Sequence, residues 1–388
     1  MTTSESAVEG RLEIHLAPAR GEVEIRSTRP LAASRIFEGR KIDDALPLLP
    51  LLFNICGQAQ AAAAVRAVES ATGERAADDV ERARERLIAL ETLREHLWRV
   101  LLDWPRFCGD KPAMQQLAPL MGLLQATRQA VDPGSTVFTQ PGLRQRNAAG
   151  DDESANWQMI AQHIGRQVFA QDPAAWLMHD LSAHDAWLRH CDTPASRMLR
   201  FVRRRDWGSI GPTRRPMLPA LDNSELRARL DADDADAFIA APSLGSDSGY
   251  ETGALARQAA HPLIDALRAE YGNALYPRLV ARLLEIAQIA VHGGTSTAAI
   301  PTVTASDGVA QVEAARGRLA HRVVLDDTRI ARYRILAPTE WNFGPMGPAT
   351  EALRGIVQGE TSIAREQAEL LIHAIDPCVG YTLDVEGS

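Results

Sequence analysis

Two cysteines near opposite ends of the chain are the side chains best suited to chemistry. Cys56 stands in the segment Asn-Ile-Cys-Gly at 54–57, and Cys378 follows Asp-Pro close to the end of the 388 residues. A helix is expected to begin at Cys56, where the positive end of the helix dipole favours a thiolate. Pro377 fixes the backbone at the point where the second sulfur is presented. If the fold brings the two sulfurs together, they form a pair of soft ligands.

Other interpretations of these cysteines and of a histidine-rich segment stay open at this point. A single cysteine also fits the role of a small buried apolar side chain, and neither one has the CxxC spacing of a zinc site. We expect Cys108 to be structural. The segment 179–191 holds three histidines and Cys191, but their spacings do not share one helical face. His179 and His190 do share a face, about 16 Å apart and too far for one ion, so we predict surface and capping histidines.

Composition limits the possible partners. The formal net charge is −8 and the sequence pI is about 5.7, which argues against nucleic-acid or anionic-membrane binding because both need a positive field. The first residues lack a secretory signal, and the longest apolar stretch, 45–56, is interrupted by prolines and too short to span a bilayer. Four cysteines in so long a chain do not form a disulfide framework. We therefore predict a cytoplasmic protein with reduced thiols and without membrane insertion.

The elements that position these residues are predicted to be mostly helical. Alternating apolar residues predict two β-hairpins, at 12–25 and 319–336. The stretch 202–250 shows one short helix capped by Asp222 and is otherwise irregular, which indicates a long solvated loop or a docking surface. The prediction is a mainly helical α+β protein with small sheets near the N-terminus and in the C-terminal third. Helical spacing predicts helices at 55–73, 76–103, 112–131, 157–169, 173–188, 253–271, 273–292, 348–357 and 363–375.

Six motifs, in the same order, resemble those of the large subunit of nickel–iron hydrogenases. They are Glu-Gly-Arg at 9–11, Phe-Glu-Gly-Arg at 37–40 with Asn-Ile-Cys-Gly at 54–57, Tyr-Glu-Thr-Gly-Ala-Leu-Ala-Arg at 250–257, Glu-Ala-Ala-Arg-Gly at 313–317, Pro-Thr-Glu-Trp-Asn-Phe-Gly-Pro at 338–345 and Asp-Pro-Cys at 376–378. The resemblance covers nearly the whole chain. It implies a single large-subunit-like domain over 1–388, with a helical core and an irregular insertion at about 202–250.

The departures from this family bear on function. The family has two cysteine pairs, and the second member of each pair bridges nickel to iron. Those second positions are Ala59 and Tyr381 here, Asp384 replaces the closing histidine, and Arg11 replaces the opening one. Neither alanine nor tyrosine bridges two metals as a thiolate does, so we expect no catalytic nickel–iron pair. This combination resembles the HupK/HoxV-type hydrogenase assembly proteins, which are diverged copies of the large subunit.

The resemblance implies a maturation scaffold without catalytic residues. Cys56 and Cys378 would hold iron that carries cyanide and carbonyl ligands, before its transfer to the hydrogenase large-subunit precursor. Arg316 would face the cyanides, and Glu9 is the second residue expected to contact the bound group. Two thiolates suit low-spin iron and leave positions for the diatomic ligands. Small maturation chaperones and the machinery that assembles the iron fragment are the other implied partners, and nickel is not expected.

Two alternatives remain at the level of sequence. A divergent hydrogenase-like oxidoreductase subunit would need an iron–sulfur partner, and a metal-free chaperone would only imitate the surface of the large subunit. The scaffold interpretation also carries a tension, because the retained cysteines match the positions that bind nickel alone in the family. Iron in the mature enzyme uses the bridging positions, which are missing here.

Overall fold

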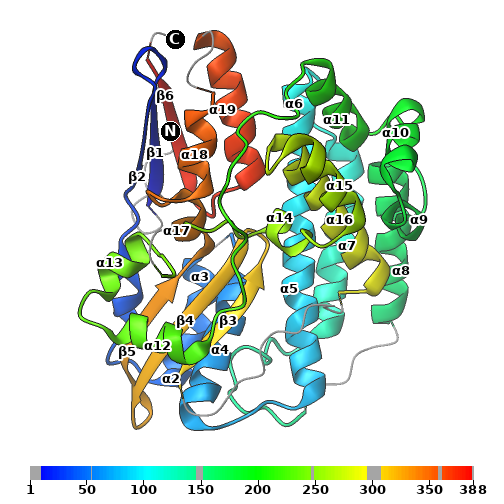
Figure 1. Ribbon diagram of the computed structural model, residues 1–388. Coiled ribbons are helices and arrows are strands. Elements are labelled where there is room, and N and C mark those ends of the chain that lie inside the picture. Colours follow the sequence, from blue (N-terminus) through cyan, green and yellow to red (C-terminus); the bar gives the residue numbers. More distant parts are fainter. Residues whose placement is uncertain are drawn as a thin grey trace, which may run out of the picture.

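Helices dominate the computed structural model, which describes residues 10–53, 55–145, 152–245, 249–294, 307–356 and 361–386. Two three-stranded sheets complete the fold, which confirms the predicted mainly helical α+β class (Figure 1). Glu9 and Asn54 lie outside the described residues. Within the described ranges, no helix combines the length and the apolar character needed to cross a bilayer.

The long helices α4 (Gly57–Thr72) and α5 (Asp78–Trp98) form the middle of the molecule, with the sheets on one side of α5 and α7 to α10 on the other (Figure 1). α4 packs closely because small residues fill it, and its predicted end at Gly73 is confirmed by a left-handed φ of 72°. The other helices are α2 (Ile42–Ala45), α3 (Leu49–Leu52), α6 (Trp104–Phe107), α7 (Met114–Val131), α8 (Asp152–Ile164), α9 (Pro173–Leu177), α10 (Leu181–His190), α11 (Pro194–Arg204), α12 (Asn223–Asp231), α13 (Ala235–Ala240), α14 (Ala254–Arg257), α15 (Pro262–Tyr271), α16 (Leu275–His292), α17 (Pro338–Phe343), α18 (Pro348–Arg354) and α19 (Thr361–Ile375).

The first sheet joins the two ends of the chain. β1 (Arg11–Ala17) pairs antiparallel with β2 (Glu22–Ser27), as the alternating residues predicted. On its other edge β1 pairs in parallel with β6 (Gly380–Val385), a strand that the sequence did not predict. Since β6 begins two residues after Cys378, this pairing anchors the chain directly beyond the second sulfur.

The second sheet carries the turn that presents Arg316. Its strands are β3 (Val309–Ala314), β4 (Gly317–Asp326) and β5 (Arg329–Leu336), all antiparallel. The predicted hairpin is confirmed as β4 and β5, with Asp327 in a left-handed conformation at the turn. β3 was not predicted, and the tight turn between β3 and β4 contains Arg316.

The stretch 202–250 differs from the solvated loop that was expected. Asp222 caps α12 as predicted, accepting hydrogen bonds from the backbone N–H groups of Ser224 and Glu225 at 2.8 and 3.1 Å. A further helix, α13, follows it. Apolar residues of this stretch pack with strand residues and with Trp341 in a second apolar cluster. The solvated-loop expectation is therefore wrong for residues 221–239. The cluster comprises Leu221, Leu226, Leu230, Phe238, Ile239, Val309, Ala320, Leu336 and Trp341.

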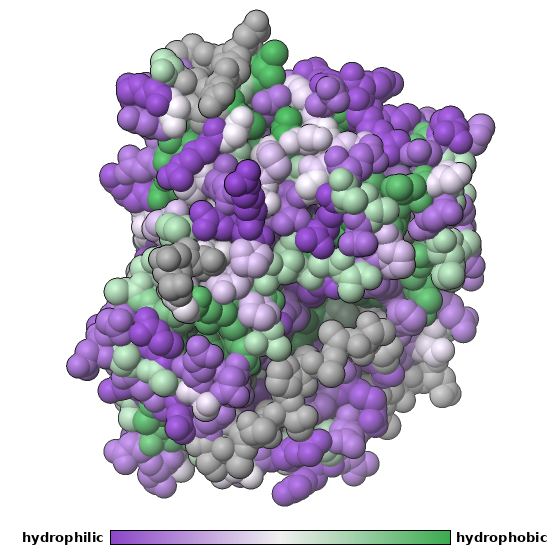
Figure 2. All heavy atoms as spheres, viewed as in Figure 1, coloured by the Kyte–Doolittle hydropathy of each residue, from purple (hydrophilic) through white to green (hydrophobic). Residues whose placement is uncertain are grey.

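Local polar groups interrupt two of the predicted helices. The helix expected at 173–188 is split into α9 and α10, because the Asp180 carboxylate caps α10 by accepting from the N–H of Ala183 at 2.8 Å. His261 caps α15 in the same way and separates it from α14. On the face shown in Figure 2, hydrophilic residues cover most of the surface and apolar residues form smaller groups between them. The main apolar cluster lies inside and includes Cys56 and Cys378.

Candidate functional site

Cys56 lies at the N-cap position of α4 and is 7% exposed. The side-chain amide of Gln60, one turn further along α4, donates to the Cys56 sulfur at 3.6 Å. Leu49 and Ala59 are fully buried nearby in the same apolar cluster. The sulfur is therefore held in a nearly closed environment with a defined hydrogen-bond donor.

The start of α4 is occupied by a carboxylate from α5. The two Glu91 oxygens accept from the backbone N–H groups of Gln58 and Ala59 at 2.9 and 3.1 Å. Burial raises the pKa of Glu91 to about 7. Burial also raises the pKa of the Cys56 thiol, and the nearby Cys378 and Glu91 raise it further. The positive end of α4 therefore acts on the Glu91 carboxylate as well as on Cys56.

Cys378 directly follows the strained end of α19. Asp376 adopts a left-handed φ of 66° immediately before Pro377, a conformation that usually requires glycine. The Thr339 hydroxyl lies 2.6 Å from the Cys378 sulfur and accepts from the Cys378 backbone N–H at 3.0 Å. Since this hydroxyl already accepts the N–H, its own proton is free to point at the sulfur. The Cys56 sulfur thus bonds to Gln60 from the next turn of α4, and the Cys378 sulfur bonds to Thr339 from α17.

Three arginines hold the Asp376 carboxylate and so stabilise its strained backbone. Arg99 donates to it at 2.8 Å, Arg316 at 3.2 Å and Arg282 at 3.3 Å. Asp376 is 3% exposed, and these guanidinium groups hold its pKa well below the usual range although burial opposes this. The cluster fixes the segment from which Cys378 projects.

Arg316 serves mainly in this internal network. Its Nε also donates to the Pro377 carbonyl at 3.0 Å, and its Nη1 donates to Glu95 at 3.1 Å. Its charge nevertheless acts on Cys56, because it lowers the pKa of that thiol, and a Cys378 thiolate would in turn raise the pKa of Arg316. Among the described residues, no hydrogen bond of Nη2 is found. Arg316 thus lies beside Pro377, the residue before Cys378.

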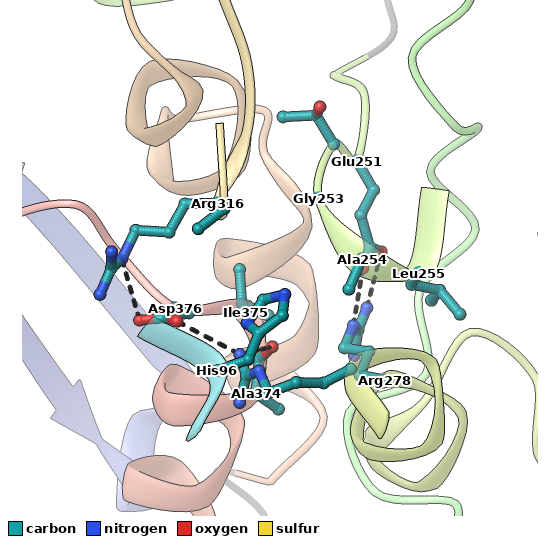
Figure 3. Close-up of a pocket in the computed structure, with 13 residues that line it drawn as sticks. His96, Glu251, Gly253, Ala254, Leu255, Arg278, Arg316, Ala374, Ile375 and Asp376 are labelled. Atoms are coloured by element: carbon teal, nitrogen blue, oxygen red, sulfur yellow. Dashed lines mark hydrogen bonds and ion pairs between the residues drawn. The ribbon is translucent and has the colours of Figure 1, made fainter. Parts of the chain in front are cut away.

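A small cavity lies on the far side of this network. It has a volume of about 10 Å³, room for about one water molecule. Arg316, Asp376 and His96 line it together with the Glu251–Arg278 ion pair, and Figure 3 shows the Arg316 guanidinium pointing at Asp376. The residues that line it do not include either cysteine.

Arg29 is a second cation beside the cysteines, and the sequence did not indicate it. It follows β2 and donates through Nη1 to Glu340. Burial lowers the pKa of Arg29, but the Glu340 carboxylate outweighs this effect, and the two cysteines would add to the rise as thiolates. The Arg29 guanidinium thus lies near enough to Cys56 and Cys378 for its charge to act on both sulfurs. In the described part of the chain, Glu340 Oε2 is buried without a hydrogen-bond partner, and Nη1 is the one Arg29 guanidinium nitrogen for which a hydrogen bond is found.

The residues at the replaced family positions do not act as ligands in this arrangement. Ala59 is fully buried in the first turn of α4. The Tyr381 ring packs edge-on against His373, with 6.1 Å between ring centroids. Asp384 is exposed on β6 and accepts from His15 at 2.8 Å. Ala59 and Tyr381, therefore, add no sulfur to those of Cys56 and Cys378.

Metal-binding side chains do not gather in larger groups. Over the described ranges, no set of three or more His, Cys, Asp or Glu side chains is arranged for a metal ion. His179 bonds to Gln171 at 2.9 Å, and His184 is fully buried against Tyr276 at 3.0 Å. The predicted surface role is therefore wrong for His184, which fills the core. The two thiols would suit a metal that brings its other ligands with it.

Comparisons with known proteins give this site its context. A family model described as nickel-dependent hydrogenase matches residues 227–382. The hydrogenase expression/formation protein HupK of Bradyrhizobium diazoefficiens is 34% identical and covers 93% of this chain and 91% of its own. HupV of Azotobacter chroococcum is 31% identical and covers 97% and 98%.

A solved structure shares the fold at low identity. A chain of the Ni-Fe-Se hydrogenase from D. vulgaris Hildenborough superposes with a TM-score of 0.59 and 17% identity, covering 92% of this chain and 94% of that one. This confirms the predicted hydrogenase-like fold, and the full-length relatives confirm the predicted group. The chain belongs to the family of hydrogenase expression/formation proteins that includes HupK, HupV and HoxV.

Proposed function

We propose that the protein is a hydrogenase maturation factor that holds iron with cyanide and carbonyl ligands between Cys56 and Cys378. The observation that carries the proposal is the pair of buried thiols, on which the charges of Arg29 and Arg316 both act. The protein would act in the cytoplasm as a carrier without turnover and would deliver the iron to a hydrogenase large-subunit precursor. Small maturation chaperones and the machinery that assembles the iron fragment would be its other partners.

The donor set supports low-spin iron as cargo. Thiolates are soft ligands, and a pair of them leaves coordination positions for diatomic ligands. The sulfurs have neighbouring donors in Gln60 and Thr339, which would stabilise bound thiolates. Deprotonation of a thiol whose pKa is raised by burial would accompany loading, since the metal replaces the proton.

The charges around the thiols support an anionic cargo. Iron(II) bound by two thiolates is neutral overall, so each cyanide adds one negative charge. Arg29 and Arg316 supply two buried cations at this point. Both have guanidinium nitrogens without a described partner, and such nitrogens donate strongly to anionic ligands.

The test is an infrared spectrum of the protein purified without oxygen, together with its iron content. We expect cyanide and carbonyl stretching bands and about one iron per chain. Cys56→Ser and Cys378→Ser should each abolish the bands. Cys108→Ser is the matched control, because Cys108 is a partly buried thiol outside the cysteine pair and should leave the spectrum unchanged.

Three outcomes would overturn the proposal. Bands that persist in both cysteine variants would place the iron elsewhere. A protein that rescues hydrogenase formation but never carries iron would favour the metal-free chaperone instead. Hydrogen uptake with a dye acceptor by the loaded protein would favour the oxidoreductase alternative.

A further inference from the structure

A buried hydrogen-bonded chain leads away from the Cys56 sulfur. Gln60 donates to the sulfur at 3.6 Å, its Oε1 lies 2.8 Å from His321 Nε2, and His321 Nδ1 lies 2.7 Å from the Tyr333 hydroxyl. The three side chains come from α4, β4 and β5, and each is at most 1% exposed. Because the three side chains are buried, the hydrogen bonds among them satisfy their polar atoms.

The protonation of His321 and Tyr333 limits the possible directions of the hydrogen bonds. Burial lowers the pKa of His321 to about 3, so the ring is neutral and carries one N–H. Burial also keeps the Tyr333 hydroxyl protonated, because it raises the pKa of that group well above its usual value. With one proton on each group, two directions of donation along the chain are conceivable.

The two directions differ at the tyrosine. If His321 Nδ1 carries the ring proton, it donates to the Tyr333 oxygen, and the hydroxyl proton is left buried without an acceptor. If Nε2 carries the proton, the hydroxyl donates to Nδ1 and Nε2 donates to Gln60. His321 Nδ1 is the acceptor that the described residues offer to this hydroxyl. Because a buried unsatisfied donor costs free energy, the second direction is favoured.

We propose that the Tyr333 hydroxyl, acting through His321, fixes the Gln60 amide with its N–H toward the Cys56 sulfur. Tyr333 and His321 are positioning residues, since neither touches the sulfur. The chain does not carry protons to Cys56, because a carboxamide has no titratable proton to pass on. Its role rests on the proposed function: an N–H directed at the sulfur favours the thiolate that binds iron.

A measurement on the unaltered protein tests the direction of the chain. In full-length protein with ¹⁵N-labelled histidine, the ring nitrogens report which one carries the proton, and His321→Gln identifies the signal. We expect His321 to carry it on Nε2. A proton on Nδ1 would overturn the proposal, whether or not any variant folds.

A second experiment measures the consequence for Cys56. Iron-free protein is treated with iodoacetamide, and alkylation of Cys56 is expressed relative to Cys378 in the same molecule. Tyr333→Phe should slow the relative rate about three- to tenfold, as expected for the loss of one hydrogen bond to the sulfur. Gln60→Leu should slow it as much. Cys191, which is equally buried but lies outside the pair, monitors general opening of the fold.

The double variant separates positioning from general loosening. If Tyr333 acts through Gln60, adding Tyr333→Phe to Gln60→Leu should cause no further change. An unchanged ratio in Tyr333→Phe, or an equal slowing in both backgrounds, would overturn the proposal. The measurement uses iron-free protein, so it can be interpreted even if the protein does not bind iron. A negative result in the alkylation test would not, in turn, contradict iron binding.

Discussion

At the scale of single residues, the two thiols differ in how the protein prepares them. Cys56 is bonded within its own helix and lies near the Glu91 carboxylate, which raises its pKa. Cys378 follows a strained aspartate and contacts the Thr339 hydroxyl. A cargo that replaces the Cys56 proton leaves a buried thiolate near the Glu91 carboxylate. Nearby cations would offset the repulsion between these two negative groups. Arg29 and Arg316 are those cations.

The contribution of Arg29 is testable with charge-matched variants. Glu340→Gln keeps Arg29 but removes its ion-pair partner, and Arg29→Gln/Glu340→Gln removes both charges. We expect the double variant to hold iron at least about tenfold more weakly than Glu340→Gln, because a hydrogen bond to a charged group is worth about 1.5–3 kcal/mol. Iron content after dialysis and the shift of the cyanide bands are the measurements. Equal iron retention in both variants would show that Arg29 does not contact the cargo.

Asp376 is predicted to be the most sensitive residue of the supporting network. Asp376→Asn keeps the shape but leaves Arg99, Arg282 and Arg316 facing a neutral amide. Breaking a buried ion pair costs about 3–5 kcal/mol, so we expect a lower midpoint of urea unfolding and loss of iron together. Asp43→Asn, at an exposed position of α2, should change the unfolding free energy by less than about 0.5 kcal/mol. A midpoint for Asp376→Asn equal to that of the control would remove the structural role given to the three arginines.

Part of the site could be predicted from the sequence, and the rest could not for a physical reason. Cys56, Cys378 and Arg316 stand in motifs whose residue types suggest ligands and a cation. Arg29 stands in no motif, and its role depends on the Glu340 contact, which joins distant segments. Glu91 has the sequence context of a solvated helix face, yet it occupies the end of α4. Burial and long-range pairing decide these roles, and neither is visible in local sequence.

At the scale of elements, the strands that were predicted are those with a local sequence pattern. β1, β2, β4 and β5 show alternation or a turn signal, and all four were found. β3 is buried along almost its whole length, so it lacks the alternation of a half-exposed strand. β6 alternates weakly and finds its partner, β1, at the opposite end of the chain. No local signal connects two strands so far apart in sequence.

The pairing of β6 with β1 is predicted to weaken as pH rises. His15 on β1 bonds to Asp384 at 2.8 Å and to Glu386 at 3.2 Å, and both carboxylates raise its pKa above 6.5. A raised histidine pKa stabilises the fold below about pH 6.5, and this contribution is lost as pH rises through the folded-state pKa. The cross-strand neighbour Glu24 pairs with Arg26 and adds no competing partner for His15.

Amide hydrogen exchange in β6 measures this effect. After correction for the intrinsic exchange rate, protection should fall between about pH 6 and about pH 8.5. His15→Gln should make the protection independent of pH over this range. Should the variant lose protection as steeply as the wild type, the pH dependence would have to come from another group.

At the scale of the whole molecule, the fold resembles that of a Ni-Fe-Se hydrogenase chain, while Ala59 and Tyr381 stand where the resemblance expects cysteines. The TM-score of 0.59 to a Ni-Fe-Se hydrogenase at 17% identity shows that the architecture persists through strong divergence. In this chain the architecture places one cysteine at the start of α4 and the other after α19, where Pro377 contacts Arg316 of the β3–β4 turn. This architecture positions two thiols from opposite ends of the chain without needing the residues that are replaced. A carrier can therefore keep the geometry of the cysteine pair and still lack the bridging ligands.

The same geometry makes a prediction for global stability. A cargo bound to both thiols links residues 56 and 378, and it binds the folded chain in preference to the unfolded one. It should therefore raise the Tm, by roughly 2–5 °C for a chain of this size. Differential scanning calorimetry of iron-loaded and iron-depleted protein measures the shift, and Cys378→Ser should unfold at the same temperature in both preparations. A Tm that rises with iron in Cys378→Ser as well would mean that the stabilising iron is not bridged by the two ends of the chain.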